Sequence, residues 1–146
     1  MDNNNFSPFT FIASRVTHID FDSSIFIFEE KEFKKSFKIS TRTNNLQSKD
    51  EKRFGEVTLE ITIDLDNQQT DENNKKASIR LTIEGGFSAP ESMPNNQFEN
   101  MLRVNGAASL YSIARGYLIS LTSQSFVRGQ VVLPLVNFIP KDTDNK

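Results

Sequence analysis

The sequence predicts an α+β fold, in which a four-stranded antiparallel sheet with a crossover connection is followed by a short and a long helix. Two observations indicate this class. The first half of the chain alternates apolar and polar residues with a period of two, as half-buried strands do. Beyond the prolines near residue 94, the spacing becomes that of an amphipathic helix. At 146 residues one domain is expected, over 9–140, with a disordered tail at 1–8 and a C-terminal tail at 141–146.

The first expected element is a strand over residues 9–21. It carries apolar residues on both faces, which indicates that both faces are covered. The next segment, 23–33, reads SSIFIFEEKEF. It is too long and too apolar for a tight hairpin, so we expect a crossover that lies over the sheet or across one of its edges.

Three further strands follow. A weak alternation over residues 37–42 predicts one strand, and clear alternations over 57–66 and 77–84 predict two more. The last two are joined by a polar hairpin loop from Asn67 to Lys76. Gly85-Gly86 is expected to end the last strand, because paired glycines mark turns.

Two helices are expected after this strand. Asn96 and Glu99 resemble a capping pair for a short helix that reaches about Arg103, and Asn105-Gly106 is expected to break it. The main helix then runs to Phe126. Its apolar stripe consists of Leu110, Ile113, Ala114, Tyr117, Leu118 and Leu121.

The opposite face of the main helix is small and uncharged. It consists of Ser109, Ser112, Gly116, Ser120 and Ser123. This face is either solvated or in contact with another helix. We favour a helix–helix contact between subunits, because solvated faces usually carry Lys and Glu whereas small residues let a second backbone approach closely. The sequence therefore predicts a tetramer, or at minimum a dimer.

Composition excludes several functional classes. There is no Cys, which rules out a disulfide framework and a thiolate metal site. A net charge of -2 disfavours nucleic acid or an anionic membrane as a partner. The apolar residues of the main helix are not continuous, so membrane insertion is not expected. No secretory signal is visible at the N-terminus, and a cytoplasmic location follows by default.

Residues for catalysis are also lacking. His18 is the only histidine, and it lies beside Asp20 on one face of the first strand with no nucleophile singled out for it. Gly85-Gly86 does not begin a phosphate-binding loop. We therefore expect no enzyme activity, no metal and no cofactor. There are 13 Phe and no Trp, which suits a core or a surface that binds apolar clients without reading their hydrogen bonds.

Short motifs occur in an informative order along most of the chain. They are Ser14-Arg15-Val16 with Asp20, Ile27-Phe28 with Phe33, Gly85 with Phe87, Ala114-Arg115, and Leu133-Pro134-Leu135-Val136-Asn137-Phe138. In this order they resemble the SecB family of protein-export chaperones. The resemblance implies a tetramer built as a dimer of dimers, with the long helices sandwiched between two sheets. It also implies ATP-independent binding of unfolded preproteins in apolar grooves, followed by transfer to the SecA motor.

The resemblance and the residues together suggest where clients bind. The expected groove residues are Phe26, Phe28, Phe33, Phe87, Leu135 and Phe138. The alternative is that these phenylalanines fill the core. For Phe26 and Phe28 we favour the groove, because connections usually run over the surface.

Contact with SecA has weaker support. Asp20 keeps an acidic position that the family uses to dock SecA, but Arg80 stands at another such position. With eight residues after Phe138, the final helix of the family is expected to be missing or vestigial. Two alternatives therefore stay open: a SecB-like chaperone dedicated to one client such as an antitoxin, and a scaffold of the same fold that holds no client.

Overall fold

The structure, a computed structural model, describes residues 8–138. Apart from Pro8, the tails expected at 1–8 and 141–146 lie outside these residues. The regular elements are β1 (Thr10–Ser23), β2 (Lys34–Lys49), β3 (Lys52–Asp66), β4 (Lys76–Pro90), α1 (Asn95–Met101) and α2 (Ala107–Ser125). Single 3-10 turns lie at Glu30–Glu32 and Asp71–Asn73.

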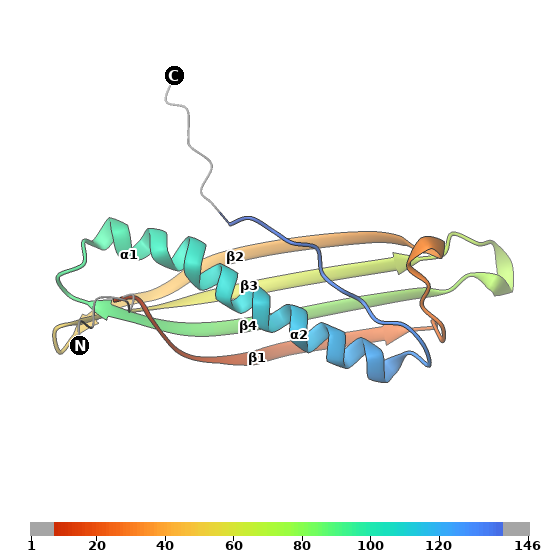
Figure 1. Cartoon of the computed structure of the whole chain (residues 1–146), viewed down its shortest axis with the longest axis horizontal. Helices are drawn as coiled ribbons and strands as arrows, with labels where there is room; N and C mark the ends of the chain where they lie inside the picture. Colours follow the sequence, from red (N-terminus) through yellow and green to blue (C-terminus); the bar gives the residue numbers. More distant parts are fainter. Residues whose placement is uncertain (1–7, 139–146) are drawn as a thin grey trace, which may run out of the picture.

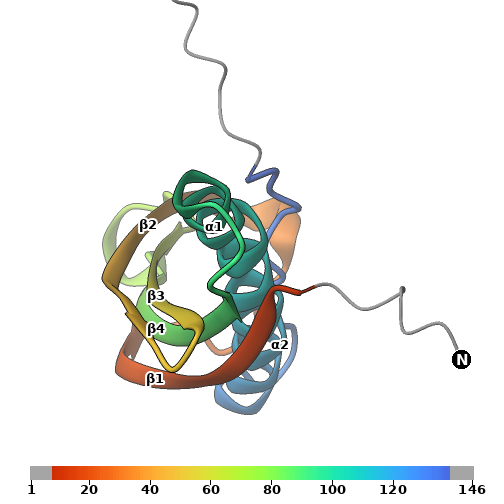
Figure 2. The ribbon, with the colours of Figure 1, turned by 90° about the vertical axis from the view of Figure 1, so that its left-hand side faces the viewer.

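The four strands form one antiparallel sheet in the order β1-β4-β3-β2, which confirms the predicted α+β class. β1 and β2 are consecutive in the chain but lie at opposite edges. The crossover between them therefore spans the width of the sheet at one end (Figure 1). Figure 2 shows that the sheet is curled and that the two helices lie on its open side.

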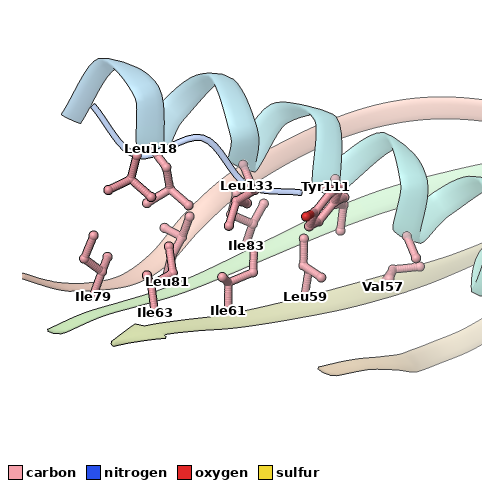
Figure 3. Close-up of a cluster of buried hydrophobic side chains, with 14 of the residues drawn as sticks. Val57, Leu59, Ile61, Ile63, Ile79, Leu81, Ile83, Tyr111, Leu118 and Leu133 are labelled. Carbon is pink, nitrogen blue, oxygen red and sulfur yellow. The ribbon is translucent and has the colours of Figure 1, made fainter. Parts of the chain in front are cut away.

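The core lies between α2 and the two central strands. Alternate residues of β3 and β4 face the helix, because side chains of a strand point to opposite faces in turn. Leu59 pairs with Ile83, Ile61 with Leu81, and Ile63 with Ile79, and all six are buried. Figure 3 shows these side chains beneath Tyr111, Leu118 and Leu133.

The paired glycines do not end the last strand as predicted, because β4 continues through them to Pro90. A Cβ atom at Gly85 would lie 2.6 Å from Cδ2 of Leu110. Gly85 is therefore needed where α2 packs directly on the sheet, and this contact between distant segments replaces the predicted turn.

The two predicted helices form one continuous helical segment. Asn105-Gly106 does not break it, since a π-helical stretch, Leu102–Gly106, joins α1 to α2. A Cβ atom at Gly106 would lie 3.0 Å from Val57 Cγ2, so the glycine serves close packing on β3. The Asn96 and Glu99 capping pair is not formed, because α1 begins at Asn95 with Pro94 at the N-cap, so Asn96 lies inside the helix.

The buried stripe of α2 is rotated relative to the predicted one. It consists of Ala107, Leu110, Tyr111, Ala114, Leu118 and Thr122. Ile113 and Tyr117, which we expected in the stripe, are exposed in the single chain. The rotation arises because a chain segment after α2 also packs on the helix and covers the side that bears Tyr111 and Thr122.

Candidate functional site

After α2 the chain turns and runs back along the helix over the same face of the sheet (Figure 1). We call residues 127–138 the strap. Val131 and Leu133 are buried, whereas Val132 between them is exposed, as expected for extended chain. The strap belongs to no strand of the sheet. It is thus an extended apolar segment laid on the helix and the core.

Side chains of α2 hold the main chain of the strap. The Val131 N–H donates to Thr122 Oγ1 at 2.9 Å, Arg115 Nε donates to the Leu133 carbonyl at 3.1 Å, and the Tyr111 hydroxyl donates to the Pro134 carbonyl. Tyr111, Arg115 and Thr122 are spaced at i, i+4 and i+11, so they share one side of the helix. We call these three side chains the α2 ladder.

The Tyr111 end of this ladder is sealed by aromatic packing. The Phe138 ring meets the Tyr111 ring edge-on, with 5.5 Å between their centroids. Burial raises the pKa of the Tyr111 phenol, and the nearby Arg115 charge acts weakly in the opposite direction. The phenol is therefore neutral and able to donate its hydrogen bond at physiological pH.

The crossover packs against the base of the strap. The Val127 N–H donates to the Phe26 carbonyl at 2.8 Å, and the Phe28 N–H donates to the Arg128 carbonyl at 2.9 Å. Gly129 follows with a φ of +95°, and a Cβ atom there would lie 2.2 Å from the Phe28 carbonyl oxygen. Glycine is therefore required where the strap leaves the crossover.

The six residues expected to line a client groove do not share one environment. The buried ones are Phe28, Phe33 and Phe87, which are core residues of the single chain. The exposed ones are Phe26 and Leu135, at 68% and 86% of their full exposure, and Phe138 is half-buried. Phe28 and Phe33 pack on one another with ring centroids 5.2 Å apart. Burial thus favours the core alternative for these two residues and for Phe87.

Sequence reasoning missed several exposed apolar side chains. Ile27 and Val127 lie beside Phe26, where the crossover meets the strap, and both are exposed. There was little indication in the sequence that Val127 is exposed, because an apolar residue next to Phe126 resembles the end of a buried helix. Together with Phe26, these residues form an apolar patch, which we call the crossover patch.

A second uncovered apolar surface involves β1. Phe11, Val16 and Ile19 pair with Phe87, Ile83 and Leu81, all buried under the helix side of the sheet, so they point to that same side. All three are nevertheless exposed, because β1 is an edge strand. Within residues 8–138, the expected cover of this strand is only partial. Phe9 and Phe21 pack against the core, whereas these three side chains and Ile12 are exposed.

The outer face of α2 is also exposed in the described part of the single chain, residues 8–138. Ser109, Ser112, Gly116, Ser120 and Ser123 are all exposed, as their assignment to this face predicted. The Ser109 hydroxyl donates to the Asn105 carbonyl at 2.8 Å, and that of Ser123 donates to the Ser120 carbonyl at 3.0 Å. With these hydroxyls bonded within the helix, the face can be covered by another chain at little cost in lost hydrogen bonds.

The convex face of the sheet is polar. Asp20 lies opposite Arg80 in the register of β1 and β4, and His18 lies opposite Thr82. Arg15 pairs with Glu84 at 3.1 Å on the same face. Asp20 is therefore beside a positive charge. Over residues 8–138, no cluster of His, Asp or Glu could hold a metal ion, and no helix is long and apolar enough to cross a membrane.

No family model matches the sequence, and no curated protein sequence matches it significantly. Solved structures do match the fold. A SecB-like chaperone from Mycobacterium tuberculosis, in complex with a ChAD peptide from the HigA1 antitoxin, superposes with a TM-score of 0.67 at 10% sequence identity. The match covers 88% of this chain and 91% of the chaperone. A Streptococcus agalactiae protein of unknown function matches with a TM-score of 0.53 at 15% identity, over 87% and 97% of the two chains.

Proposed function

We propose that this chain, which has the fold of a SecB-like chaperone, binds unfolded polypeptides without ATP and keeps them from aggregating. The observation that carries the proposal is the crossover patch next to an extended apolar segment laid on α2. Apolar burial is non-directional and is worth about 25 cal/mol per Å². A surface of this kind can therefore accept many unfolded sequences. The Mycobacterium tuberculosis neighbour, which holds a peptide, supports the same role.

Clients contact the exposed members of the predicted set in this proposal. Phe26 and Leu135 offer accessible apolar surface, and Phe138 offers part of its ring. Phe28, Phe33 and Phe87 are buried in the core, where they stabilise the fold and do not contact clients. When one contact forms, it raises the effective concentration of the neighbouring client segments, so several weak contacts along one unfolded chain give a higher overall affinity.

A homo-oligomer is the second part of the proposal. The outer face of α2 would meet a second copy, and the exposed β1 side chains would extend the contact. Ile113 and Tyr117 lie on the flank of α2 almost opposite Tyr111 and Arg115, so they leave the strap free. The β2 edge carries Lys34, Lys38, Arg42 and Lys49, and lysine-rich edges resist pairing. The β1 side is therefore the better place for a partner subunit, in a dimer or a tetramer.

An apolar client-binding surface fits two kinds of chaperone, which differ in the range of clients that they bind. The first is a cytoplasmic holdase that passes unfolded preproteins to SecA for export, with Asp20 as a docking residue. Arg80, which lies opposite Asp20 in the sheet, weakens this assignment. The second is a chaperone dedicated to one client such as an antitoxin. The antitoxin peptide bound to the Mycobacterium tuberculosis neighbour favours the second range.

An aggregation assay tests the proposal. Several unrelated proteins are unfolded and diluted with and without an equimolar amount of this chain, with no nucleotide present, and light scattering is recorded. Suppression for most of them supports a general holdase. Suppression for only a candidate antitoxin supports a dedicated chaperone. If scattering is unchanged for every protein, antitoxin included, the chain holds no client and the scaffold alternative replaces the proposal.

A further inference from the structure

The α2 ladder binds the strap in the way that a protein binds an extended peptide ligand, through hydrogen bonds to its main chain. Its contacts are to the main chain at three points: the N–H of Val131, the carbonyl of Leu133 and the carbonyl of Pro134. None of these three groups is specific to the residue that carries it. Side-chain selectivity comes only from the two buried positions, Val131 and Leu133.

We propose that this channel is itself a client-binding site, and that the strap is an occupant which an extended apolar segment of a client replaces. This inference rests on the proposed function and deepens it, because it adds a second binding site beside the crossover patch and names the class of segment bound there. Tyr111, Arg115 and Thr122 would bind the main chain of the client as they now bind that of the strap.

The strap shows which segments fit. Two apolar side chains at i and i+2 enter the core, and the residue between them points to solvent, as Val132 does. The next residue contributes only its carbonyl, so even proline is accepted there, as Pro134 shows. Aliphatic residues at alternate positions are common in segments that form strands, and an unfolded protein exposes such segments. The site therefore selects a frequent pattern and no single sequence.

The contacts of the ladder allow the strap to leave. The Thr122 hydroxyl also donates to the Leu118 carbonyl at 2.7 Å, so departure of the strap does not leave it unbonded. The strap is outside the sheet and takes no strand ladder with it. Its base stays attached to the crossover through the Val127 and Phe28 amides. Gly129, in the left-handed conformation, lies between this anchored base and the exchangeable part.

Hydrogen exchange on the full-length protein tests the exchange of occupants. The probe is a reduced and alkylated protein that stays unfolded in buffer, labelled so that its binding is measured by anisotropy in parallel. At saturation, we expect the Val131 amide hydrogen to exchange about tenfold faster or more. When a client segment displaces the strap, this amide loses its hydrogen bond to Thr122 Oγ1. The Val127 amide, bonded to the Phe26 carbonyl, should keep its protection.

The outcomes separate the two proposals. If the probe binds while protection of Val131 is unchanged or increased, the strap stays in place and this inference is wrong, although the proposed function stands. If the probe does not bind at all, the proposed function fails and the inference fails with it. Faster exchange at both amides would mean that the whole segment unfolds, which also contradicts replacement on a fixed base.

A matched pair of variants gives a second test. Leu133 and Leu81 are each 1% exposed, but only Leu133 belongs to the strap. Leu133→Ala weakens the strap as a competitor, so apparent client affinity should rise by about five- to tenfold. Leu81→Ala should destabilise the fold without raising the affinity per folded molecule. Equal affinities for Leu133→Ala and the wild type would overturn the inference, and the exchange experiment decides the question if Leu133→Ala does not fold.

Discussion

Phe26 and Phe28 lie two residues apart in the crossover, yet the structure places them in opposite environments. Phe28 is 7% exposed, and its ring lies 5.2 Å from that of Phe33 and 5.7 Å from that of Phe126. Phe26 is 68% exposed. Replacing each in turn by Ala should therefore separate a role in folding from a role in client binding.

The magnitudes follow from burial. Truncation of a buried Phe costs about 3–5 kcal/mol, because apolar contacts are lost and a cavity remains. In a domain of this size each kcal/mol lowers the melting temperature by roughly 2–4 °C, so Phe28→Ala should melt about 6–20 °C below the wild type. Phe26→Ala removes mostly exposed surface and should change stability by about 0.5 kcal/mol or less.

Two measurements on each variant complete the test. Urea unfolding gives the free energy of unfolding, and anisotropy with a labelled unfolded client gives affinity per folded molecule. We expect Phe28→Ala to lose stability but keep its affinity, and Phe26→Ala to show the reverse. Similar stability losses in both variants would contradict the environments described, and full affinity in Phe26→Ala would remove Phe26 from the client surface.

Three further predictions concern other parts of the chain. Within residues 8–138, a Cβ atom at Gly116 or Gly86 would meet nothing within 4 Å. Gly116→Arg should therefore shift the mass measured by light scattering toward that of the monomer, because an unpaired charge buried in the interface costs several kcal/mol. The control, Gly86→Arg on the convex face, should leave the assembly intact. A wild type that is monomeric at micromolar concentration would contradict the interface. Gly129→Ala should cost more than 1 kcal/mol in urea unfolding because of its positive φ and the Phe28 carbonyl, and a neutral result would show that this turn relaxes freely. Burial raises the pKa of Tyr111 above its ordinary value of 10.0, so its contribution to stability is complete below pH 10 and is lost as pH rises through the folded pKa. The stability difference between wild type and Tyr111→Phe should accordingly shrink above pH 10, and a difference independent of pH would mean that the phenol titrates normally.

Local patterns in the sequence predicted the sheet well. Apolar and polar residues alternate in phase over residues 57–65 and 77–83, because one face of each strand packs under α2. A period of two indicates a strand with one buried face. The same logic identified the outer face of α2. These features depend on neighbours within one element, which a single sequence contains.

Features that depend on contacts between distant segments were not predictable in the same way. In the sequence, Gly85 resembles a turn residue and Gly106 a helix breaker. In the structure, each glycine instead allows close packing, Gly85 against Leu110 and Gly106 against Val57. Phe28 was assigned to a surface groove because it lies in a connection, but Phe33 and Phe126 bury it there. The α2 ladder was missed altogether, since Arg115 and Leu133 are brought together only by the reversal of the chain after α2.

The central claim is that this chain distinguishes unfolded from folded polypeptide. The direct measurement is a titration of one protein in two forms, native and permanently unfolded by reduction and alkylation, into this chain without nucleotide. We predict saturable binding of the unfolded form and no measurable binding of the native form. Equal binding of both forms, or binding of neither across several proteins and a candidate antitoxin, would contradict the assignment as a chaperone.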